Sequence, residues 1–566
     1  MCPIAGIYGK NNGDVSSQIH LMLDTMCHKK PGEGWLIAND DMQKWQRDYS
    51  SKAGTVCRKG TLGQISFAKG NKPLERPYLD YKRRLSLLYE GKLYNYKKLR
   101  SKFLENHQLV TGTAAEVIIY LLEDRYQGDL EKALKQVLAD VDGPYTIAVS
   151  NGVQTILVRD PVGKRPAYIA ENNKYSAFAS QKKALWKVGL QNVKPLRAGM
   201  LATFEGDTIT VSQALPMGSE DFEIEIKDLN NAIDEYRKVL YSAIVKRMPN
   251  TGRVGVLVSG GVDSCLIAKL VNELVADREV EVIAYTAGLA NAPDIDYAES
   301  FVHDLGLRHR VRKLSIDEVE AYISKVVRAI EERDFIQIEA GIGVYAAVEM
   351  ASQDGIKIIF SGQGPDELWG GYSWYPEVIK EEGYQGFQQR MWSDLERGDI
   401  ETLDRENKIA MAHGVEMVFP YLDMEVIKVA MSTSPRLKVS SKNGNLGKLP
   451  HRALAERVGV PETYANRPKD AAQHGTGIHD VLDEIAQRNG FTPELVEDIG
   501  YTSQQITKER LGSSSRYGYL FGEEELWTIP SHIQLFLDVI AYRNSLLNEQ
   551  QRARIEQFLQ KAEFHR

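Results

Sequence analysis

The middle of the chain contains an apolar run, Val254 to Val258, followed at once by Ser259-Gly260-Gly261-Val262-Asp263-Ser264. A helical pattern, Leu266 to Ala276, comes directly after this hexapeptide, so the sequence predicts a strand, a tight turn and a helix. Glycines allow the backbone to turn tightly and to approach a ligand closely. The unpaired amides and the positive end of a helix attract anionic oxygens, so such a turn is suited to phosphate.

The turn alone leaves two interpretations open. It lacks the lysine of the Walker loop, Gly-x-x-x-x-Gly-Lys-Ser/Thr, so a phosphate loop at this place would differ from the P-loop. An ordinary strand-to-helix turn, with a serine as the helix cap, would also account for two glycines. All six residues, set between a strand and a helix, favour the phosphate loop.

The segments on both sides of this turn alternate between strand and helix patterns. Further strands are predicted at Glu281 to Thr286 and at Ile356 to Phe360, and helices at Leu229 to Lys246 and at Tyr297 to Leu305. This alternation predicts an α/β fold, with a doubly wound parallel sheet whose ligands bind at the carboxyl ends of the strands. From about residue 375 to the end, helical patterns dominate, so we expect a helical C-terminal part.

The N-terminal part of the chain consists of short β-like runs between turn signals, with more strand than helix. This pattern predicts an α+β fold of stacked antiparallel sheets with helices on their outer faces. The segment 206–228 is polar and acidic without a sustained period, and we interpret it as a linker between domains at 2–205 and 229–566. The predicted elements are the strands Ile4–Tyr8, Leu62–Ala68, Leu85–Tyr89, Tyr145–Ser150, Thr155–Arg159, Ser176–Ala179 and Met200–Phe204, and the helices Val15–Met26 and Ala115–Tyr126.

The composition is that of a globular protein from a reducing compartment. The chain has 566 residues, 43% of them hydrophobic, which at roughly 100 to 200 residues per domain predicts two to four domains. Its four cysteines, Cys2, Cys27, Cys57 and Cys265, fit neither a disulfide framework nor a metal pair. The formal net charge of -7 does not favour nucleic acid as a partner. No apolar run approaches the roughly 18 residues that span a bilayer, so we expect a cytoplasmic protein without a membrane partner.

A second glycine-rich turn follows the predicted strand Ile356 to Phe360, with the sequence Ser361-Gly362-Gln363-Gly364-Pro365-Asp366-Glu367. If the sheet is parallel as predicted, these acids come next in space to Asp263 of the first turn. Together the two turns resemble those of the asparagine synthetase family, which belongs to the ATP pyrophosphatases; these enzymes adenylate a substrate and release pyrophosphate. The resemblance continues through Val415-Glu416, Pro420 to Asp423, Lys448 with Arg452, Arg467-Pro468-Lys469 and Gly475-Thr476-Gly477.

The resemblance implies that ATP and Mg²⁺ are bound, and it implies roles for residues of both turns. Asp263 and Asp366 would be the Mg²⁺ ligands, since this hard cation prefers carboxylate oxygens. Lys469 matches the family lysine that reaches the α-phosphate, although a lone lysine in such a stretch is more often a surface charge. The residues that would bind ATP and pyrophosphate are Ser259, Gly260, Gly261, Asp263, Ser264, Ser361 and Gly362.

The N-terminal part resembles the glutamine amidotransferase domain of the N-terminal-nucleophile type, which implies a fold of that hydrolase class. After removal of Met1, Cys2 would have a free α-amine that can activate its thiol as the catalytic nucleophile. The two resemblances cover nearly all of the chain in the order that asparagine synthetases use, in which the first domain supplies ammonia from glutamine through a tunnel. The matching segments of the first domain are Ile4 to Gly9, Tyr94-Asn95, Glu116-Val117 and Arg159 to Pro166.

The glutamine pocket departs from the family pattern. Ser66 stands where an arginine clamps the glutamine carboxylate, and Ala114 stands where an aspartate takes the glutamine amine. Glu90 replaces an asparagine of the oxyanion site, where a carboxylate would repel the developing oxyanion unless it were protonated, and the Gly91 amide alone is left. One oxyanion donor is worth roughly 3 to 4 kcal/mol, so we expect weak or lost glutamine hydrolysis, with ammonia as the nitrogen source.

Two positions concern the carboxylate that accepts the nitrogen. The family arginine linked with the amino-acid substrate falls on Glu339, and the frequent glutamate of the second turn is Gln363. An anion in place of a cation in a carboxylate pocket costs several kcal/mol, so either another cation serves aspartate or the acceptor is different. Alternatively, Glu339 is a solvated helix residue and the alignment there is shifted by one turn.

These features lead to three hypotheses. The first is an asparagine synthetase-like ligase that uses ATP, forms AMP and pyrophosphate, and converts aspartate to asparagine. The second has the same fold but makes another amide, or closes a ring, from a different carboxylate, as the β-lactam-forming relatives do. The third is a non-catalytic homologue that binds nucleotide or a partner subunit, and the complete pyrophosphate-binding set argues against it. A homodimer is a further expectation from the family.

Overall fold

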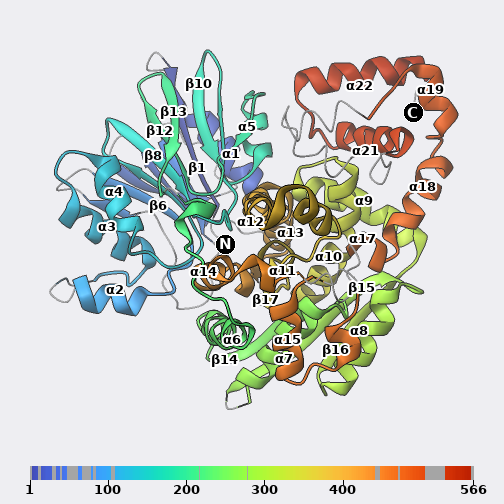
Figure 1. Cartoon of the computed structure of the whole chain (residues 1–566). Helices are drawn as coiled ribbons and strands as arrows, with labels where there is room; N and C mark the ends of the chain where they lie inside the picture. The colour runs from blue at the N-terminus through green and yellow to red at the C-terminus, as the bar shows by residue number, and fades with distance from the viewer. Residues whose placement is uncertain are drawn as a thin grey trace. The chain divides into compact units, whose positions relative to one another are not determined.

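The computed structural model describes residues 3–10, 14–27, 33–38, 41–46, 61–66, 78–80, 85–103, 107, 109–215, 217–276, 278–439, 447–468, 472–503 and 530–562. The chain divides into two compact units, and each is described by itself (Figure 1). Unit 1 comprises residues 1–217 with 402–407, and unit 2 comprises residues 218–401 and 408–566. Two predicted site residues, Cys2 and Lys469, lie outside the described residues, and of Ser66 only the backbone is described.

Unit 1 contains two antiparallel sheets, which confirms the fold predicted for the N-terminal part. In the first sheet, β1 (Ile4–Gly9) lies between β10 (Tyr175–Ala179) and β4 (Thr61–Ser66), in the order β11-β9-β10-β1-β4-β2-β3. The second sheet has the order β13-β12-β8-β7-β6-β5. The other elements are β2 (Glu33–Ala38), β3 (Asp41–Gln46), β5 (Tyr78–Asp80), β6 (Leu85–Gly91), β7 (Tyr145–Ser150), β8 (Gln154–Arg159), β9 (Tyr168–Glu171), β11 (Lys194–Pro195), β12 (Met200–Glu205), β13 (Thr208–Gln213), α1 (Ser16–Met26), α2 (Tyr96–Phe103), α3 (Ala114–Arg125), α4 (Leu130–Leu138) and α5 (Lys182–Lys187).

The two sheets of unit 1 pack face to face, and helices cover their outer sides. Between the sheets, the ring centroids of Phe178 and Phe204 lie 5.5 Å apart within one hydrophobic core. Helices α3 and α4 form a second core with the outer side of β6, β7 and β8, and α1 and α5 form a third with β1, β9 and β10. Because successive strand residues point to opposite faces, one strand can contribute to two cores. The result is a four-layer helix–sheet–sheet–helix unit.

The segment predicted as a linker differs from the structure in its first part. Residues 208–213 form β13, which pairs antiparallel with β12 from Thr208 opposite Glu205 to Gln213 opposite Met200. Strand β13 lies at the edge of the sheet and its side chains are mostly exposed, so it needs few apolar residues and its alternation is easily overlooked. The remainder of the segment leads to helix α6 (Leu229–Val245) of unit 2.

Unit 2 contains a five-stranded sheet in the order β16-β15-β14-β17-β18, and all of its strand pairs are parallel. This confirms the predicted doubly wound α/β fold with a helical C-terminal part. The sheet is built from β14 (Thr251–Leu257), β15 (Glu279–Leu289), β16 (Arg308–Leu314), β17 (Ile358–Phe360) and β18 (Glu416–Val418). The helices are α7 (Val262–Leu274), α8 (Pro293–Asp304), α9 (Ile316–Ile330), α10 (Phe335–Gln353), α11 (Pro365–Trp369), α12 (Tyr375–Glu401), α13 (Leu403–His413, which begins in unit 1), α14 (Met424–Ser432), α15 (Leu449–Arg457), α16 (Glu462–Ala465), α17 (Ala472–Gly475), α18 (Ile478–Arg488), α19 (Pro493–Ile499), α21 (Ser531–Arg543) and α22 (Glu549–Lys561).

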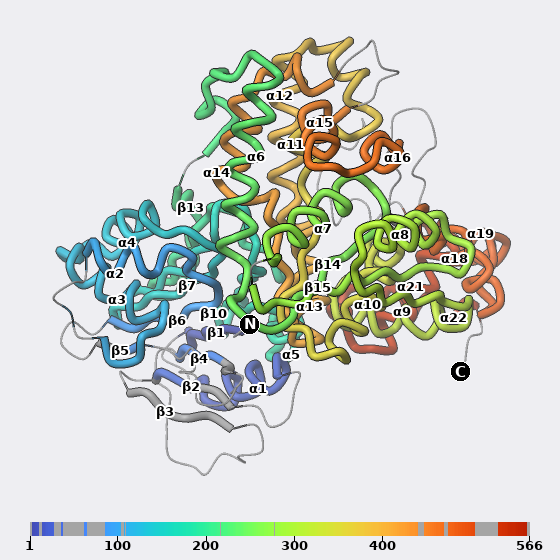
Figure 2. Tube along the Cα trace, turned by 90° about the horizontal axis from the view of Figure 1, so that it is seen from below, coloured from blue at the N-terminus to red at the C-terminus, as the bar shows by residue number. Residues whose placement is uncertain are grey.

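The two glycine-rich turns leave the carboxyl ends of neighbouring strands. Strand β14 pairs with β15 on one side and with β17 on the other, where Val256 lies opposite Phe360. The chain runs outward from β14 through β15 to β16 and then returns to the other side of β14, with α7 and α8 on one face of the sheet and α9 and α10 on the other (Figure 2). Such a reversal of strand order is the place where open α/β sheets bind ligands.

Strand β16 was not predicted, because four of its seven residues are arginine or lysine. It is an edge strand, and its charges pair with acids of other elements, as Arg310 does with Asp354 at 3.0 Å. Helix α7 begins at Val262 rather than Leu266, because Gly261 of the turn is already its N-cap. Among the helices that the structure describes, none has the length and apolar character to cross a membrane.

Gly6 of β1 provides a test of the packing in unit 1. A Cβ at Gly6 would lie 2.2 Å from Cε1 of Phe178 and 3.0 Å from Cδ2 of Leu62, in the core between the sheets. We expect Gly6→Ala to destabilise unit 1 by about 1–3 kcal/mol, because overpacking forces buried groups apart. The measurement is the midpoint of thermal unfolding. Gly398→Ala in α12 is the matched control, since an added Cβ there meets nothing within 4 Å. Equal midpoints for the two variants would contradict the described packing.

Candidate active site

The first glycine-rich turn is held in shape by its own two serines. The Ser259 amide donates to Ser264 Oγ at 3.1 Å, and Ser264 Oγ donates to the Gly261 carbonyl at 3.0 Å. Gly260 has a φ of +75°, and a Cβ there would lie 2.3 Å from Cβ of Tyr297, so only glycine fits. At Gly261, a Cβ would meet nothing among the described residues nearer than Ser259 Oγ at 3.6 Å. The start of α7 therefore borders open space, where an anion can approach the helix amides.

The second turn packs directly on the first. A Cβ at Gly362 would lie 3.0 Å from the amide nitrogen of Ser264, so this close contact requires glycine. Ser361 donates its amide to the Val418 carbonyl of β18 at 3.0 Å, which anchors the start of the turn to the sheet. Gly364 has a φ of +119° and is the N-cap of α11, whose first turn carries Asp366. The two turns therefore lie together at the carboxyl ends of β14 and β17, as predicted.

One buried lysine contacts both aspartates. Lys448 Nζ lies 2.6 Å from Asp263 Oδ2 and 2.8 Å from Asp366 Oδ1, and its side chain is 2% exposed. Lys448 has a φ of +65° and forms the N-cap of α15. Gly371 leaves the room for this contact, since a Cβ there would be 2.0 Å from Asp366 Oδ1 and 2.1 Å from Lys448 Cε. The two carboxylates thus converge on a single positive charge.

The convergence of Asp263 and Asp366 suits a divalent cation. Mg²⁺ is commonly bound by one or two carboxylates and completes its octahedral shell with phosphate oxygens and waters. Asp263 and Asp366 each place one carboxylate oxygen against Lys448 Nζ, so the two carboxylates lie close together. Two neighbouring carboxylates are the ligands that fit Mg²⁺ bound together with a nucleotide. Within the described ranges, no group of three or more His, Cys, Asp or Glu side chains could hold a metal ion.

His451 orients Asp263 from the buried side. Its Nε2 lies 3.0 Å from Asp263 Oδ1, and its Nδ1 lies 2.8 Å from the Tyr236 hydroxyl. Burial lowers the pKa of His451, although the hydrogen bond with Asp263 opposes this, so the neutral ring is favoured. A neutral ring that accepts from Tyr236 carries its proton on Nε2, the ring nitrogen that faces Asp263. Tyr421 also fixes this residue, because its hydroxyl donates to the Asp263 carbonyl at 2.8 Å.

The acid next to Asp366 has a different environment. Burial and the neighbouring Asp366 carboxylate raise the pKa of Glu367 to about 7, while a hydrogen bond from the Tyr372 hydroxyl opposes the shift. Glu367 therefore gains or loses its proton near neutral pH. Asp366, by contrast, is paired with Lys448.

Arg467 connects the first turn to the C-terminal helices. Its Nη1 donates to the Ser259 carbonyl at 2.9 Å, and its Nη2 donates to Asp294 Oδ1 at 2.8 Å. Gly475 closes on the same acid, since a Cβ there would be 2.5 Å from both carboxylate oxygens of Asp294. Lys469 follows Arg467 by two residues but lies outside the described residues, so its contact with the α-phosphate stays a prediction.

Glu339 is buried in α10 and pairs with a histidine of α18. Its side chain is 1% exposed, and its Oε2 lies 2.8 Å from Nδ1 of His479. The alternative that Glu339 is a solvated helix residue is therefore wrong. The ring of His474 from α17 lies near that of His479, with centroids 4.5 Å apart. Gln363 is half-buried in the second turn, and its place in the acceptor pocket stays a prediction.

In unit 1, Glu90 lies near the start of β1. Glu90 is fully buried and accepts a hydrogen bond from Ser180 Oγ. Ser180 Oγ also accepts from the amide of Ile4, at 2.9 Å, and Ile4 is two residues from Cys2 in the sequence. Burial raises the pKa of Glu90, with the Ser180 hydrogen bond opposing it, so the protonated form is favoured more than in water. The repulsion predicted for a charged Glu90 is accordingly reduced.

The other positions of the predicted glutamine pocket are less informative. A Cβ at Gly91 would lie 2.1 Å from the Pro144 carbonyl, so glycine is required there by packing. Ala114 is the first residue of α3 and is 8% exposed. Ser66 ends β4, and nothing further is described for it. The roles predicted for these residues stay predictions.

Glu116 organises the loop that precedes α3. Its carboxylate accepts from the amides of Val110, Thr111 and Gly112 at 2.6, 2.8 and 2.7 Å, and from the Thr111 hydroxyl at 2.7 Å. Burial acts to raise the pKa of Glu116, but these hydrogen bonds outweigh it and lower the pKa. The sequence marks Glu116 only as a match to a family, whereas its contacts explain why a carboxylate is needed.

Sequence analysis gives no role to four residues that the structure brings into the site. Lys448 and Arg467 belong to matching segments, but neither has a signal that separates it from a surface cation. Lys448 and His451 are three residues apart at the start of a short helix, a spacing that places side chains on one face. His479 comes shortly after a Gly-Thr-Gly run, and such a run does not indicate in the sequence that a helix begins there. In each case the partner is distant in the sequence, so only the fold reveals it.

Comparisons with known proteins cover both units. The asparagine synthase family model matches residues 235–384 and 379–538, and the glutamine amidotransferase domain model matches residues 1–217. A Methanocaldococcus jannaschii protein with the provisional name glutamine-hydrolysing asparagine synthetase 1 is 28% identical over 551 residues, which are 88% of this chain and 98% of that protein. Glutamine-hydrolysing asparagine synthetase B of Escherichia coli is 26% identical over 462 residues, 79% of each chain. The glutamine-hydrolysing asparagine synthetase of Gallus gallus is 24% identical over 476 residues, 76% of this chain and 82% of that protein.

Glu116→Gln tests the role of the carboxylate in unit 1. We expect a loss of about 2 kcal/mol in stability at neutral pH, because hydrogen bonds to a charged group are replaced by weaker ones. The folded-state pKa of Glu116 is lowered, so its stabilisation is present above the unfolded-state pKa and is lost as pH falls through the folded-state pKa.

Thermal unfolding followed from about pH 7 to about pH 3 should therefore show a difference between the two proteins that shrinks with falling pH. Glu131→Gln in α4 is the matched control, because its ion pair with Lys135 is exposed. A difference that does not change with pH would contradict this role for Glu116.

Proposed function

This chain belongs to the asparagine synthetase family, and we propose that it converts aspartate to asparagine with ATP and ammonia. Family membership makes it an ATP-dependent ligase that forms a carbon–nitrogen bond. The proposal adds the acceptor, the nitrogen source and the roles of individual residues. It also assigns amide synthesis to residues 229–566 and the amidotransferase fold to residues 2–205.

The meeting of the two glycine-rich turns is the strongest support for the proposal. The two turns meet where Gly362 packs on Ser264, and the acids of both turns are held by Lys448. An anion-binding helix start and two convergent carboxylates at one switch point are what a metal-bound nucleotide needs. A protein that only binds a partner subunit would not require this combination.

In the proposed reaction, a carboxylate oxygen of aspartate attacks the α-phosphorus of ATP. The bond from that phosphorus to the bridging oxygen breaks, and pyrophosphate leaves with the electron pair. Ammonia then attacks the carbonyl carbon of aspartyl-AMP, loses a proton and expels AMP. The leaving pyrophosphate is held by Ser259, Gly260, Gly261, Ser264, Ser361 and Gly362.

The remaining residues of the site set charge and position. Mg²⁺, when held by Asp263 and Asp366, neutralises phosphate oxygens and polarises the phosphorus for attack. Lys469 offsets the negative charge that develops at the α-phosphate. His451 fixes the orientation of Asp263, which supports the metal-binding geometry as an outer-shell partner does in other metal sites.

We also propose that free ammonia, rather than glutamine, supplies the nitrogen. Ser66 and Ala114 stand where the family has charges for the glutamine carboxylate and amine, so glutamine loses two ionic contacts. Losing such contacts lowers hydrolysis by several orders of magnitude, even if Cys2 is processed and reactive. The well-packed cores of unit 1 support a domain that keeps its fold without this activity.

A second candidate is an amide ligase or cyclase of this family that acts on a different carboxylate. Glu339 favours it, because a buried acid occupies the place of the family arginine. The identity of the acid that supports pyrophosphate release distinguishes the two candidates. The homodimer expected from the family is tested by sedimentation of the whole chain.

Asp263→Asn and Asp366→Asn test the assignment of the two carboxylates. We expect each to lower Mg²⁺-ATP-dependent pyrophosphate release, with aspartate and ammonium, by roughly 100-fold or more, because charge stabilisation at the phosphates is lost. Stabilisation of the folded protein by Mg²⁺-ATP in a thermal shift measurement should also disappear. Asp296→Asn on the exposed side of α8 is the control that should change neither. Full activity of either variant would rule out its proposed role.

Glutamate release tests the proposed nitrogen source. With glutamine as sole nitrogen source, the wild-type protein should release no more glutamate than Cys2→Ala, while ammonium supports asparagine formation. The rate with ammonium should rise with pH, because more of it is unprotonated NH₃. Glutamate release that Cys2→Ala abolishes would show that the first domain is an active glutaminase.

A further inference from the structure

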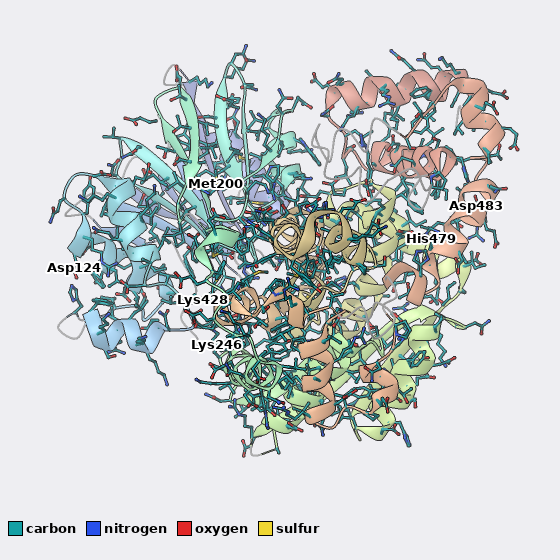
Figure 3. The ribbon with its side chains drawn as sticks, in the orientation of Figure 1. Asp124, Met200, Lys246, Lys428, His479 and Asp483 are labelled. Atoms are coloured by element: carbon teal, nitrogen blue, oxygen red, sulfur yellow. The ribbon has the colours of Figure 1, made fainter. Side chains whose placement is uncertain are left out.

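In the ion pair between Glu339 and His479, the acid is buried and the histidine is partly exposed to solvent. Glu339 is 1% exposed, whereas the side chain of His479 is 39% exposed. The ring uses Nδ1 for Glu339, at 2.8 Å, and its Nε2 has no hydrogen-bond partner among the described residues. His479 lies in the first turn of α18, and Figure 3 shows it on the same helix as Asp483. The pair thus presents an imidazole edge, not a carboxylate, to its surroundings.

This pair is linked to the carboxyl end of the sheet, where the phosphate turn begins. Thr476, three residues before His479, accepts from the Leu289 amide at the end of β15, at 2.9 Å. A Cβ at Gly343, one helical turn after Glu339, would lie 3.2 Å from Cγ2 of Thr476. The neighbouring Gly475 packs on Asp294, the acid that Arg467 joins to Ser259. Gly475 and Thr476 therefore tie the residues just before His479 to Asp294 of α8 and to the end of β15.

The groups around His479 favour a positive ring. Three titratable groups face it, namely Glu339 from α10, His474 from α17 and Asp480 on its own helix. The hydrogen bond with Glu339 raises the pKa of His479, although partial burial opposes the shift. Asp483, the next acid along α18, pairs instead with His532 of α21, whose Nε2 lies 2.6 Å from Asp483 Oδ1. The hydrogen bond with Glu339 therefore favours the protonated ring, directly beside the position where the family has an arginine.

We propose that His479, held by Glu339, binds a carboxylate of the acceptor other than the one that is adenylated. The inference rests on the proposed function and names its substrate class: an acceptor with two carboxylates, such as aspartate. His479 is the specificity-determining residue, and Glu339 is a positioning residue that acts through it. The reversal of charge at position 339 is then explained, because the acid supports a replacement cation instead of facing the substrate.

Substrate analogues allow the contact to be located. Aspartate and succinate each retain a second carboxylate, whereas β-alanine is aspartate without its α-carboxylate. The KM of each acid is measured by ATP–pyrophosphate exchange, which does not depend on ammonia. We expect His479→Gln to raise the KM for aspartate and succinate roughly 10- to 100-fold and to leave that for β-alanine unchanged. His532→Gln removes a histidine from a comparable carboxylate pair in the same unit and should leave every KM unchanged.

A pH series separates the two residues. The ratio of the KM for aspartate to that for β-alanine cancels ionisations common to both acids, and it should rise as pH increases through the pKa of His479. Glu339→Gln keeps the hydrogen-bonding shape but removes the charge, so this rise should move to lower pH. In His479→Gln the ratio should not depend on pH. An NMR signal of His479, assigned through its loss in His479→Gln, should shift with aspartate and not with β-alanine.

The outcomes distinguish this inference from the proposed function. Exchange with aspartate at a KM that His479→Gln does not change would overturn the inference and leave the proposed function standing. Exchange that occurs only with acids carrying one carboxylate would overturn both the inference and aspartate as the acceptor. Absence of exchange with every acid would contradict the proposed function itself, and the inference with it.

Discussion

Lys448 places one ammonium group between two carboxylates that belong to different glycine-rich turns. Asp263, Asp366 and Lys448 are far apart in the sequence and meet because β14 and β17 are neighbours at the point where the strand order reverses. Asp366 is buried and Asp263 is half-buried, and two carboxylates this close repel each other unless a cation lies between them. The glycine at 371 follows from this contact, since any side chain there would occupy the place of the lysine. The two carboxylates are therefore held together by the positive charge of Lys448.

The same principle distinguishes half-buried Asp263 from the buried acids Glu339 and Glu90. Asp263 has a full cation beside it and a neutral histidine that directs its second oxygen. Glu339 accepts a hydrogen bond from His479 and raises the pKa of that ring, which couples the buried acid to a partly exposed histidine. Glu90 accepts a hydrogen bond from Ser180, which with the charge of Arg165 acts to lower its pKa, but burial outweighs both and favours the neutral acid. Burial alone does not decide the charge of these acids; the partner that each fold element supplies decides it.

The sequence predicted the parts of the fold that have a strong local pattern and the parts of the site that lie in short motifs. The sheet core, the two glycine-rich turns and the closeness of Asp263 to Asp366 follow from apolar runs and turn signals, and the structure has them where the sequence predicts. Strands β13 and β16 were missed, because edge strands can be polar or basic and lose the alternation that marks a strand. Lys448, His451 and His479 have no local signal, because the partners that give them a role, Asp366, Asp263 and Glu339, are distant in the sequence. The burial of Glu339 and its pairing with His479 could not be predicted for the same reason, because a buried acid and a solvated one look alike in the sequence.

In the proposed reaction, the acceptor carboxylate attacks the α-phosphorus of ATP where the two glycine-rich turns meet. The most direct measurement uses aspartate labelled with ¹⁸O in its side-chain carboxylate, together with Mg²⁺-ATP and ammonium, and follows the label by mass spectrometry. We predict that AMP gains one labelled oxygen for each asparagine formed and that pyrophosphate gains none. Label in inorganic phosphate with formation of ADP, or AMP without label, would contradict it.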